Sequence, residues 1–181
     1  MQEYTMRRLK HLIEYIAVRA FAGLCAALPL DRASNLGGWM GRTIGPRTGI
    51  DRAARAQLSA IFPELSQRDI DHYITEMWDN LGRTMAEYPH LDTIARTRVT
   101  VDDRAHITHD PGFFDHPALF IAGHFANWEV AGPAFLAQTN TPIHLVYRPA
   151  NNPFVDALMT RFRSLNGALR TLAKSRGGMR A

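Results

Sequence analysis

Hydrophobic residues recur at helical spacing along the first half of the chain. Apolar side chains stand three or four positions apart over residues 66–88, and Ser66 followed by Asp69 is a helix-capping pattern. Pro89 is expected to end this helix because proline cannot continue the backbone ladder. Glycine and proline punctuate residues 37–49, which indicates short helix and turns. The pattern therefore predicts a helical region in which the helix over 66–88 gives one apolar face to a core.

An amphipathic pattern also occupies the N-terminus, where one helical face is apolar and most charged residues lie on the other. The longest uncharged run of this N-terminal stretch, residues 20–30, has eleven residues, whereas roughly 18–20 are needed to cross a bilayer. Such a helix either lies in the headgroup layer of an anionic membrane or packs on its own domain, and periodicity alone favours packing. The apolar face consists of Leu9, Leu12, Ile13, Ile16, Ala17, Ala20 and Leu24.

The second half of the chain has the sequence pattern of alternating strands and helices. Residues 118–122 (ALFIA) form a short apolar run that predicts a buried strand, and residues 142–147 (PIHLVY) predict a second one. The segment between them is long enough for a crossover helix. Asn152 followed by Pro153 predicts the start of another helix, which should end near residues 166–167. Helices followed by strand–helix–strand–helix predict an α/β fold with a mostly parallel sheet.

The end of the chain shapes the expected domain organisation. Residues 170–181 are basic and carry no apolar periodicity, and two strands are few for a complete α/β domain. We therefore expect an incomplete sheet in a C-terminally truncated chain. The predicted organisation is an amphipathic membrane-associating helix over residues 1–30, followed over residues 31–181 by the N-terminal part of the α/β domain.

Composition and charge narrow the class of protein. Apolar residues make up 46% of the chain and charged residues 21%, which is typical of a globular protein. The net charge of +4 suits an anionic partner, but no basic block is interleaved with aromatic residues, so nucleic acid is not expected. His and Asp residues gather at 102–116 without a His-x-His or His-x-x-x-His pair, which favours a polar surface loop and no metal site.

The segment IAGHFANWE at residues 121–129 carries the candidate chemistry. It places His124 at the C-terminal end of a predicted strand, where catalytic groups gather in open α/β sheets. Glu129 follows five residues later, with Asn127 as a candidate helix cap between them. Neutral imidazole can take a proton from a hydroxyl, and a carboxylate can hold the other ring nitrogen. The segment contains no Ser or Cys, which favours direct attack by a substrate hydroxyl, although the motif alone also fits a histidine that satisfies loop hydrogen bonds.

Motifs along much of the chain carry a family resemblance. They are RAAR at 52–55 with FP at 62–63, WDNLGR at 78–83 leading to EY at 87–88, GHFANWE at 123–129, and VYRPANNP at 146–153 followed by Arg161. In these motifs the sequence resembles the lipid A biosynthesis acyltransferases, which add secondary lauroyl or myristoyl chains to lipid A precursors. This family belongs to the lysophospholipid acyltransferase-like superfamily.

The resemblance implies roles for particular residues. The family's catalytic His-x-x-x-x-(Asp/Glu) pair falls on His124 as general base and Glu129 as its partner. The resemblance places Arg148 at the substrate cleft, where its planar guanidinium would suit phosphate. Weaker candidates for substrate binding, of which loop capping explains the asparagines equally well, are Asn127, Asn151, Asn152 and Arg161.

The resemblance also implies a reaction and a location. The expected reaction is O-acyl transfer from acyl-acyl carrier protein to a lipid A precursor, at the cytoplasmic face of the bacterial inner membrane. The enzyme would bind that anionic surface peripherally or monotopically and would need no cofactor. A lysophospholipid or another glycolipid as acceptor, coenzyme A as donor carrier, and a non-catalytic membrane-binding fragment stay open. The chain departs from the family in two ways. Family members are usually longer. Pro133 also falls inside the helix expected after Glu129, where it should kink that helix or mark a later start.

Overall fold

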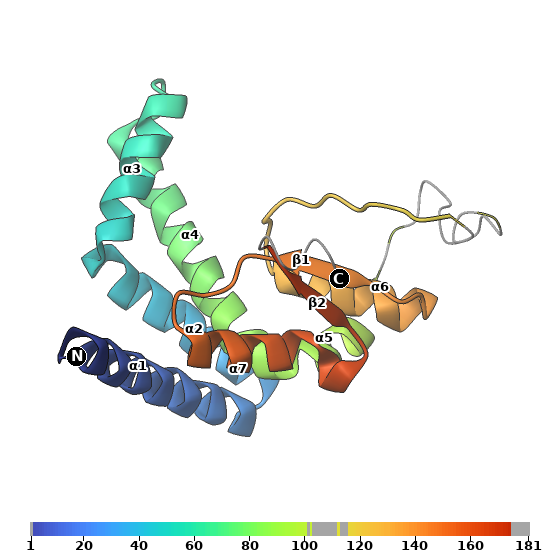
Figure 1. Cartoon of the computed structure of the whole chain (residues 1–181). Coiled ribbons are helices and arrows are strands. Elements are labelled where there is room, and N and C mark those ends of the chain that lie inside the picture. The colour runs from blue at the N-terminus through green and yellow to red at the C-terminus, as the bar shows by residue number, and fades with distance from the viewer. Residues whose placement is uncertain (1, 101, 103–111, 113–115, 175–181) are drawn as a thin grey trace. The chain divides into compact units, whose positions relative to one another are not determined.

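The computed structural model describes residues 2–100, 102, 112 and 116–174 (Figure 1). The chain divides into two compact units, one made of residues 1–23 with 88–181 and the other of residues 24–87. His106 and His109 of the predicted polar loop lie outside the described residues. Within the described ranges, no group of three His, Cys, Asp or Glu side chains could hold a metal ion.

The unit of residues 24–87 is helical. Its elements are α2 (Leu30–Ile44), the 3-10 turn η1 (Gly45–Arg47), α3 (Gly49–Ile61) and α4 (Gln67–Glu87). The predicted cap of α4 is confirmed: the backbone N–H of Asp69 donates to Ser66 Oγ at 3.3 Å, and that of Ser66 donates to Asp69 Oδ2 at 3.2 Å. The apolar stripe of α4 forms the core as predicted, since Ile70, Ile74 and Trp78 are buried together.

Glycines let α2 and α4 approach each other closely. A Cβ added to Gly41 of α2 would lie 2.0 Å from the Trp78 carbonyl oxygen, and one added to Gly82 of α4 would lie 2.1 Å from the Gly37 carbonyl oxygen. Both obstacles are backbone atoms of the facing helix, which cannot rotate away as a side chain can. Hydrogen atoms are therefore the only side chains that fit at this crossing.

Residues of two of the sequence motifs meet at Asp51, a buried carboxylate in the first turn of α3. Trp78 Nε1 donates to Asp51 Oδ1 at 2.8 Å, and Arg55 Nε donates to Asp51 Oδ2 at 2.7 Å. The hydrogen bond from Trp78, followed by that from Arg55, lowers the pKa of this carboxyl group. The RAAR and WDNLGR motifs thus supply a polar link between α3 and α4.

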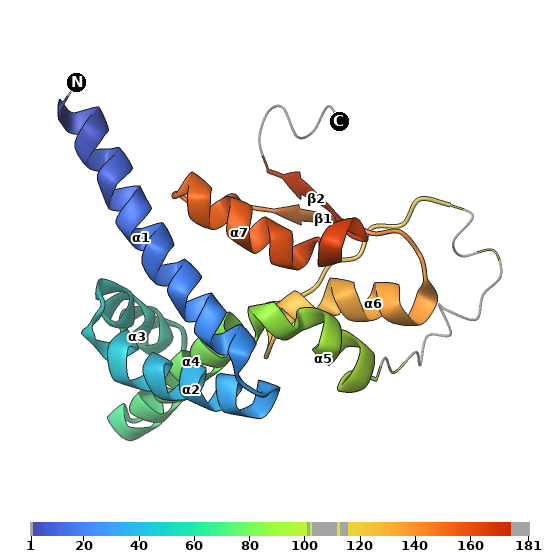
Figure 2. The same ribbon diagram turned by 90° about the horizontal axis from the view of Figure 1, so that it is seen from below.

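The unit of residues 1–23 and 88–181 contains the sheet. Its elements after α1 (Gln2–Ala27), whose last residues belong to the other unit, are η2 (Tyr88–His90), α5 (Leu91–Thr97), η5 (Trp128–Val130), α6 (Ala131–Thr139), β1 (His144–Tyr147), α7 (Pro153–Arg163), η6 (Leu165–Gly167) and β2 (Arg170–Ala173). β1 and β2 are parallel, with His144 opposite Arg170 and Tyr147 opposite Ala173, and α7 is the crossover helix between them. Figure 2 shows α7 on one side of the strands. The predicted α/β class with a small, incomplete parallel sheet is confirmed.

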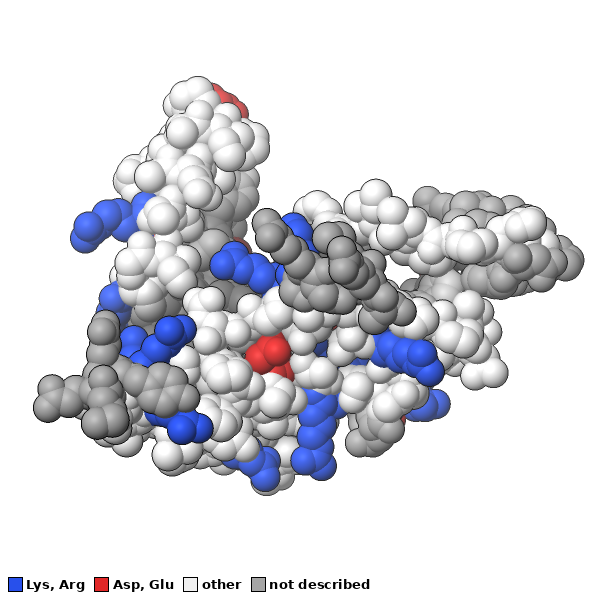
Figure 3. Space-filling model, viewed as in Figure 1, with Lys and Arg blue, Asp and Glu red and all other residues white. Residues whose placement is uncertain are grey.

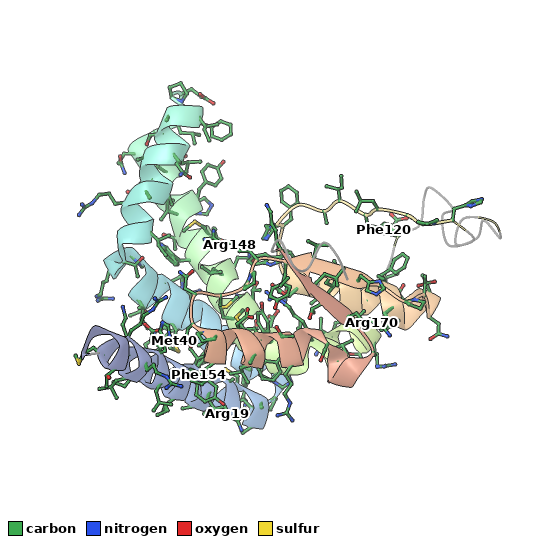
Figure 4. The ribbon with its side chains drawn as sticks, viewed as in Figure 1. Arg19, Met40, Phe120, Arg148, Phe154 and Arg170 are labelled. Atoms are coloured by element: carbon green, nitrogen blue, oxygen red, sulfur yellow. The ribbon has the colours of Figure 1, made fainter. Side chains whose placement is uncertain are left out.

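The two strands are not the pair that the sequence predicts. Residues 118–122 are extended but pair with no strand in the described part of the chain; Leu119 is 84% exposed and Ile121 91%. Phe120, labelled in Figure 4, makes a ring contact with Phe135 of α6 at 5.0 Å. The unpredicted strand is β2, in the basic segment. An apolar run gives a strand only where a neighbour supplies its ladder hydrogen bonds, and β1 finds that neighbour after the α7 crossover.

The sequence predicts the helix ends better than it predicts the strand pairing. Asn152 caps α7 as predicted, because its Oδ1 accepts from the backbone N–H groups of Phe154 and Val155 at 3.0 and 3.4 Å. Pro133 marks a late helix start, the second of the two expected outcomes. α6 begins at Ala131, so the proline falls in the first turn, where an N–H has no partner within the helix.

α1 packs on its own unit through the face opposite its apolar stripe. The Tyr15 ring lies 5.9 Å from the ring of Phe154 in α7, whereas Leu9, Ile13 and Ile16 of the stripe are 51%, 60% and 57% exposed. The apolar stripe is therefore not the face that packs on the unit, and its binding to a membrane stays a prediction. The described residues include no helix that combines the length and the apolarity needed to cross a membrane.

Replacing Gly41 with alanine is expected to lower the free energy of unfolding by about 1–3 kcal/mol, because the new methyl group would meet the Trp78 backbone. The matched control is Gly49→Ala at the first position of α3, where a Cβ would meet nothing within 4 Å. Urea denaturation followed by circular dichroism compares the two. Equal stability of both variants would contradict the close approach of α2 and α4.

Candidate active site

The candidate catalytic segment enters the first turn of a helical stretch through a tight bend. Ala126 has a left-handed backbone with φ of 44°, which turns the chain between His124 and η5. Asn127 then caps η5 as predicted, since its Oδ1 accepts from the backbone N–H of Glu129 at 3.2 Å. A residue other than glycine in this conformation carries local strain, a feature that recurs at functional sites.

The Glu129 carboxylate is buried and held by a two-pronged ion pair. Arg163 Nε donates to Oε2 and Arg163 Nη2 to Oε1, both at 2.7 Å. Trp128 Nε1 adds a third hydrogen bond to Oε1 at 3.0 Å. The side chains of Glu129 and Arg163 are only 9% and 14% exposed, so this is a fork-to-carboxylate contact shielded from water.

Two tyrosines complete the surroundings of Arg163. Its Nη2 also donates to the Tyr88 hydroxyl oxygen at 2.8 Å. Its guanidinium carbon lies 5.6 Å from the centre of the Tyr88 ring and 5.4 Å from that of Tyr147, within the range of cation–π attraction. The last turn of α7, the η2 turn and the end of β1 thus converge on one cation.

The charges of this cluster are fixed at neutral pH. Burial alone would raise the pKa of Glu129, but hydrogen bonds from Arg163 and Tyr88 outweigh burial, and the net pKa is lowered. Burial raises the pKa of Tyr88, and the adjacent Glu129 charge adds to that effect. The hydrogen bond with Glu129 raises the pKa of Arg163. Glu129 is therefore a carboxylate, Tyr88 a neutral phenol and Arg163 a cation.

His124 lies beside this cluster and is exposed. Its ring centroid is 4.9 Å from that of Trp128, with 41° between the ring planes, so Trp128 contacts both His124 and Glu129. Among the described residues, no hydrogen bond joins His124 to Glu129. The pairing of a ring nitrogen with the carboxylate is thus not present here, and the catalytic roles of the two residues stay predictions.

Arg163 is the site residue that the sequence does not single out. The predicted candidate on α7 is Arg161, which is exposed. The two arginines are about 200° apart on a helix with 3.6 residues per turn, on either side of the apolar row Phe154, Leu158 and Phe162. Helical periodicity cannot choose between those sides, because the choice depends on where Glu129 lies in space.

The other predicted residues occupy the loop between β1 and α7. Arg148, labelled in Figure 4, and Asn151 are exposed, whereas Asn152 is buried. Asp156 of α7 holds this loop, since its Oδ1 accepts from the backbone N–H of Ala150 at 2.8 Å. On the face shown in Figure 3, lysines and arginines are scattered over several elements.

Replacing Arg163 with methionine is expected to lower the free energy of unfolding by about 3–5 kcal/mol at pH 7, because a buried carboxylate loses its partner. In this variant burial raises the pKa of Glu129, so the neutral acid becomes accessible on acidification. The loss relative to the wild type should therefore shrink as the pH falls from 7 to 5.

The measurement is urea denaturation at both pH values, with Arg161→Met on the exposed edge of the same helix as the control. In the wild type, Glu129 has a lowered pKa, so its contribution is complete above the unfolded value of about 4.3 and is lost as the pH falls through the lower folded value. A loss that is equal at both pH values would contradict the buried-pair assignment.

Comparison with known proteins bears on the whole chain. Neither the curated protein sequences nor the solved structures include a match to it. The profile of the family described as bacterial lipid A biosynthesis acyltransferase matches residues 3–180, a range that includes α1 apart from its first residue, the capped segment from His124 to Glu129, and α7 with Arg163. The chain therefore belongs to the bacterial lipid A biosynthesis acyltransferase family.

Proposed function

We propose that this acyltransferase moves a fatty acyl chain from acyl-acyl carrier protein to a hydroxyl of a lipid A precursor, with His124 as general base. The observation that carries the proposal lies within the family match: an exposed imidazole stands beside a buried carboxylate kept ionised by Arg163. The exposed ring can meet a substrate hydroxyl, and the buried charge can stabilise the imidazolium that proton transfer creates.

The reaction uses a single proton carrier. A ring nitrogen of His124 takes the proton of the acceptor hydroxyl as its oxygen bonds to the carbonyl carbon of the donor thioester. The tetrahedral intermediate then collapses, the carbon–sulfur bond breaks, and the imidazolium returns the proton to the leaving thiolate. An ester and a free thiol are the products, and this route needs no metal and no cofactor.

Glu129 serves this cycle through its position and its charge. It lies five residues after His124, on the other side of the capped turn, and Trp128 contacts both side chains. Catalytic hydrogen bonds are often long or poorly aligned before substrate binds. We therefore place the closing of His124 on Glu129 in the substrate complex, with Arg163 holding the carboxylate still while the histidine moves.

Both proposed substrates carry anionic groups, which exposed residues of the β1–α7 region can bind. The donor carries a phosphodiester in its phosphopantetheine arm, and the lipid A precursor carries phosphate. Arg148 is exposed in the loop held by Asp156, so its guanidinium can meet such a phosphate. Asn127, Asn151 and Arg161 are weaker candidates for the same contacts, and the side chain of Asn127 already caps η5.

The proposed place of the reaction is the cytoplasmic face of the bacterial inner membrane, with α1 lying in the headgroup layer. Its apolar stripe is exposed, and Arg8, Lys10 and Arg19 are exposed on the same helix. Cations beside an apolar stripe can reach lipid phosphates while the stripe inserts.

The His124→Ala variant is expected to lose on the order of 10²–10⁴ in the rate of acyl transfer, because it removes the proposed base. The control is His144→Ala, since His144 is an exposed histidine of β1. Transfer of a labelled acyl chain by the full-length enzyme is measured with a lipid A precursor and, separately, with a lysophospholipid. Wild-type turnover by His124→Ala would refute the mechanism, and acylation of the lysophospholipid alone would refute the acceptor.

Introducing glutamate at both Ile13 and Ile16 is expected to abolish most binding to anionic vesicles, since both side chains lie on the exposed stripe. Flotation with phosphatidylglycerol vesicles at low and high salt measures this. Wild-type binding should weaken with salt without vanishing, because apolar insertion is not screened. The control adds the same charge at the same spacing on α3, as Ala56→Glu with Ser59→Glu. Equal recovery of both double variants would contradict the role of α1.

A further inference from the structure

Asn152 uses every hydrogen-bonding group of its side chain within the protein. Its Oδ1 accepts from the backbone N–H groups of Phe154 and Val155, which caps α7. Its Nδ2 donates to the His11 carbonyl oxygen at 2.8 Å and to Glu14 Oε2 at 3.0 Å. A carboxamide has two lone pairs and two N–H donors, so all four are engaged, and the residue is only 6% exposed.

These contacts join α1 and α7, two helices of the same unit. Glu14 and His11 lie on the face of α1 that packs on α7, beside the ring contact between Tyr15 and Phe154. Figure 4 labels Phe154 at the start of α7, next to α1. The exposed apolar stripe of α1 faces away from this contact. A buried polar link of this kind specifies one arrangement, because breaking it leaves several polar groups unsatisfied.

α7 ends at the candidate site. α7 begins after its cap at Asn152 and ends at Arg163, whose guanidinium holds Glu129. Its eleven residues span roughly 16 Å at a rise of 1.5 Å per residue. A helix this short moves as a rigid rod, so a shift at the capped end changes the place of Arg163.

We propose that Asn152 is a positioning residue that locks α1 to α7, so that the membrane-facing helix and the helix that holds Glu129 act as one body. This inference rests on the proposed function for its effect on activity. It gives Asn152 a role other than the substrate contact expected from the sequence, since its amide is already occupied. Seating of α1 in the membrane then sets the orientation of the catalytic carboxylate towards the lipid acceptor.

The test exchanges the amide of Asn152 and the carboxylate of Glu14 in two steps. Asn152→Asp keeps an oxygen for the α7 cap but places a second carboxylate against Glu14. This variant should lower kcat on acceptor in anionic vesicles by on the order of tenfold to a hundredfold through misplacement of Glu129. KM for the soluble acyl donor should not change. Adding Glu14→Gln restores a donor opposite the introduced carboxylate and should recover most of the lost rate. Asn140→Asp, the same change at an exposed position, is the control.

Hydrogen exchange in α1 provides a readout that does not depend on activity. Exchange over residues 8–16 should be faster in Asn152→Asp and in Glu14→Ala than in the wild type, and should return to the wild-type rate in the double variant that exchanges the partners. If Asn152→Asp does not fold, Glu14→Ala takes its place in both assays. Unchanged exchange, or unchanged kcat with faster exchange, would overturn the proposal. A wild type that acylates no lipid would instead overturn the proposed function and leave the exchange result standing.

Discussion

The ion pair between Glu129 and Arg163 is the contact on which the candidate site depends. Taking two opposite charges out of water costs free energy that only close geometry and further hydrogen bonds can offset. Here the fork geometry, Trp128 and the Tyr88 hydroxyl supply those bonds. The pair therefore contributes little net stability by itself but leaves few alternatives, because any other arrangement strands a buried charge.

That requirement explains how elements distant in sequence come together. Tyr88 follows α4, Glu129 stands in η5, and Arg163 ends α7, yet their side chains meet around one guanidinium. Tyr147 at the end of β1 covers another part of the same cation. The parallel β1–α7–β2 unit places the C-terminal turn of α7 beside η5, and the polar contacts then fix its rotation.

The two compact units show different ways of holding helices together. In the unit of residues 24–87, α2 and α4 rely on glycines that bring backbones into contact. In the other unit, α1 and α7 meet through Asn152 and an aromatic pair. The first contact tolerates no added atoms, whereas the second depends on donors and acceptors that match. The apolar stripe of α1 takes part in neither contact and is exposed, which suits the proposed membrane surface.

The sequence by itself determined the features that depend on neighbouring residues. The caps at Ser66, Asn127 and Asn152 and the apolar stripe of α4 all follow from local hydrogen bonding and periodicity. The motifs also carried the family, which the match over residues 3–180 bears out.

Only the tertiary structure decided which segments pair and which charges meet. The apolar run at 118–122 lacks a strand partner in the described chain, while Arg170–Ala173 has one, because strand pairing depends on what lies alongside. Likewise, Arg161 and Arg163 are equivalent in periodicity, and only the position of Glu129 in space makes Arg163 its partner. Contacts between residues distant along the chain leave no periodic pattern in the sequence, so only the folded structure shows them.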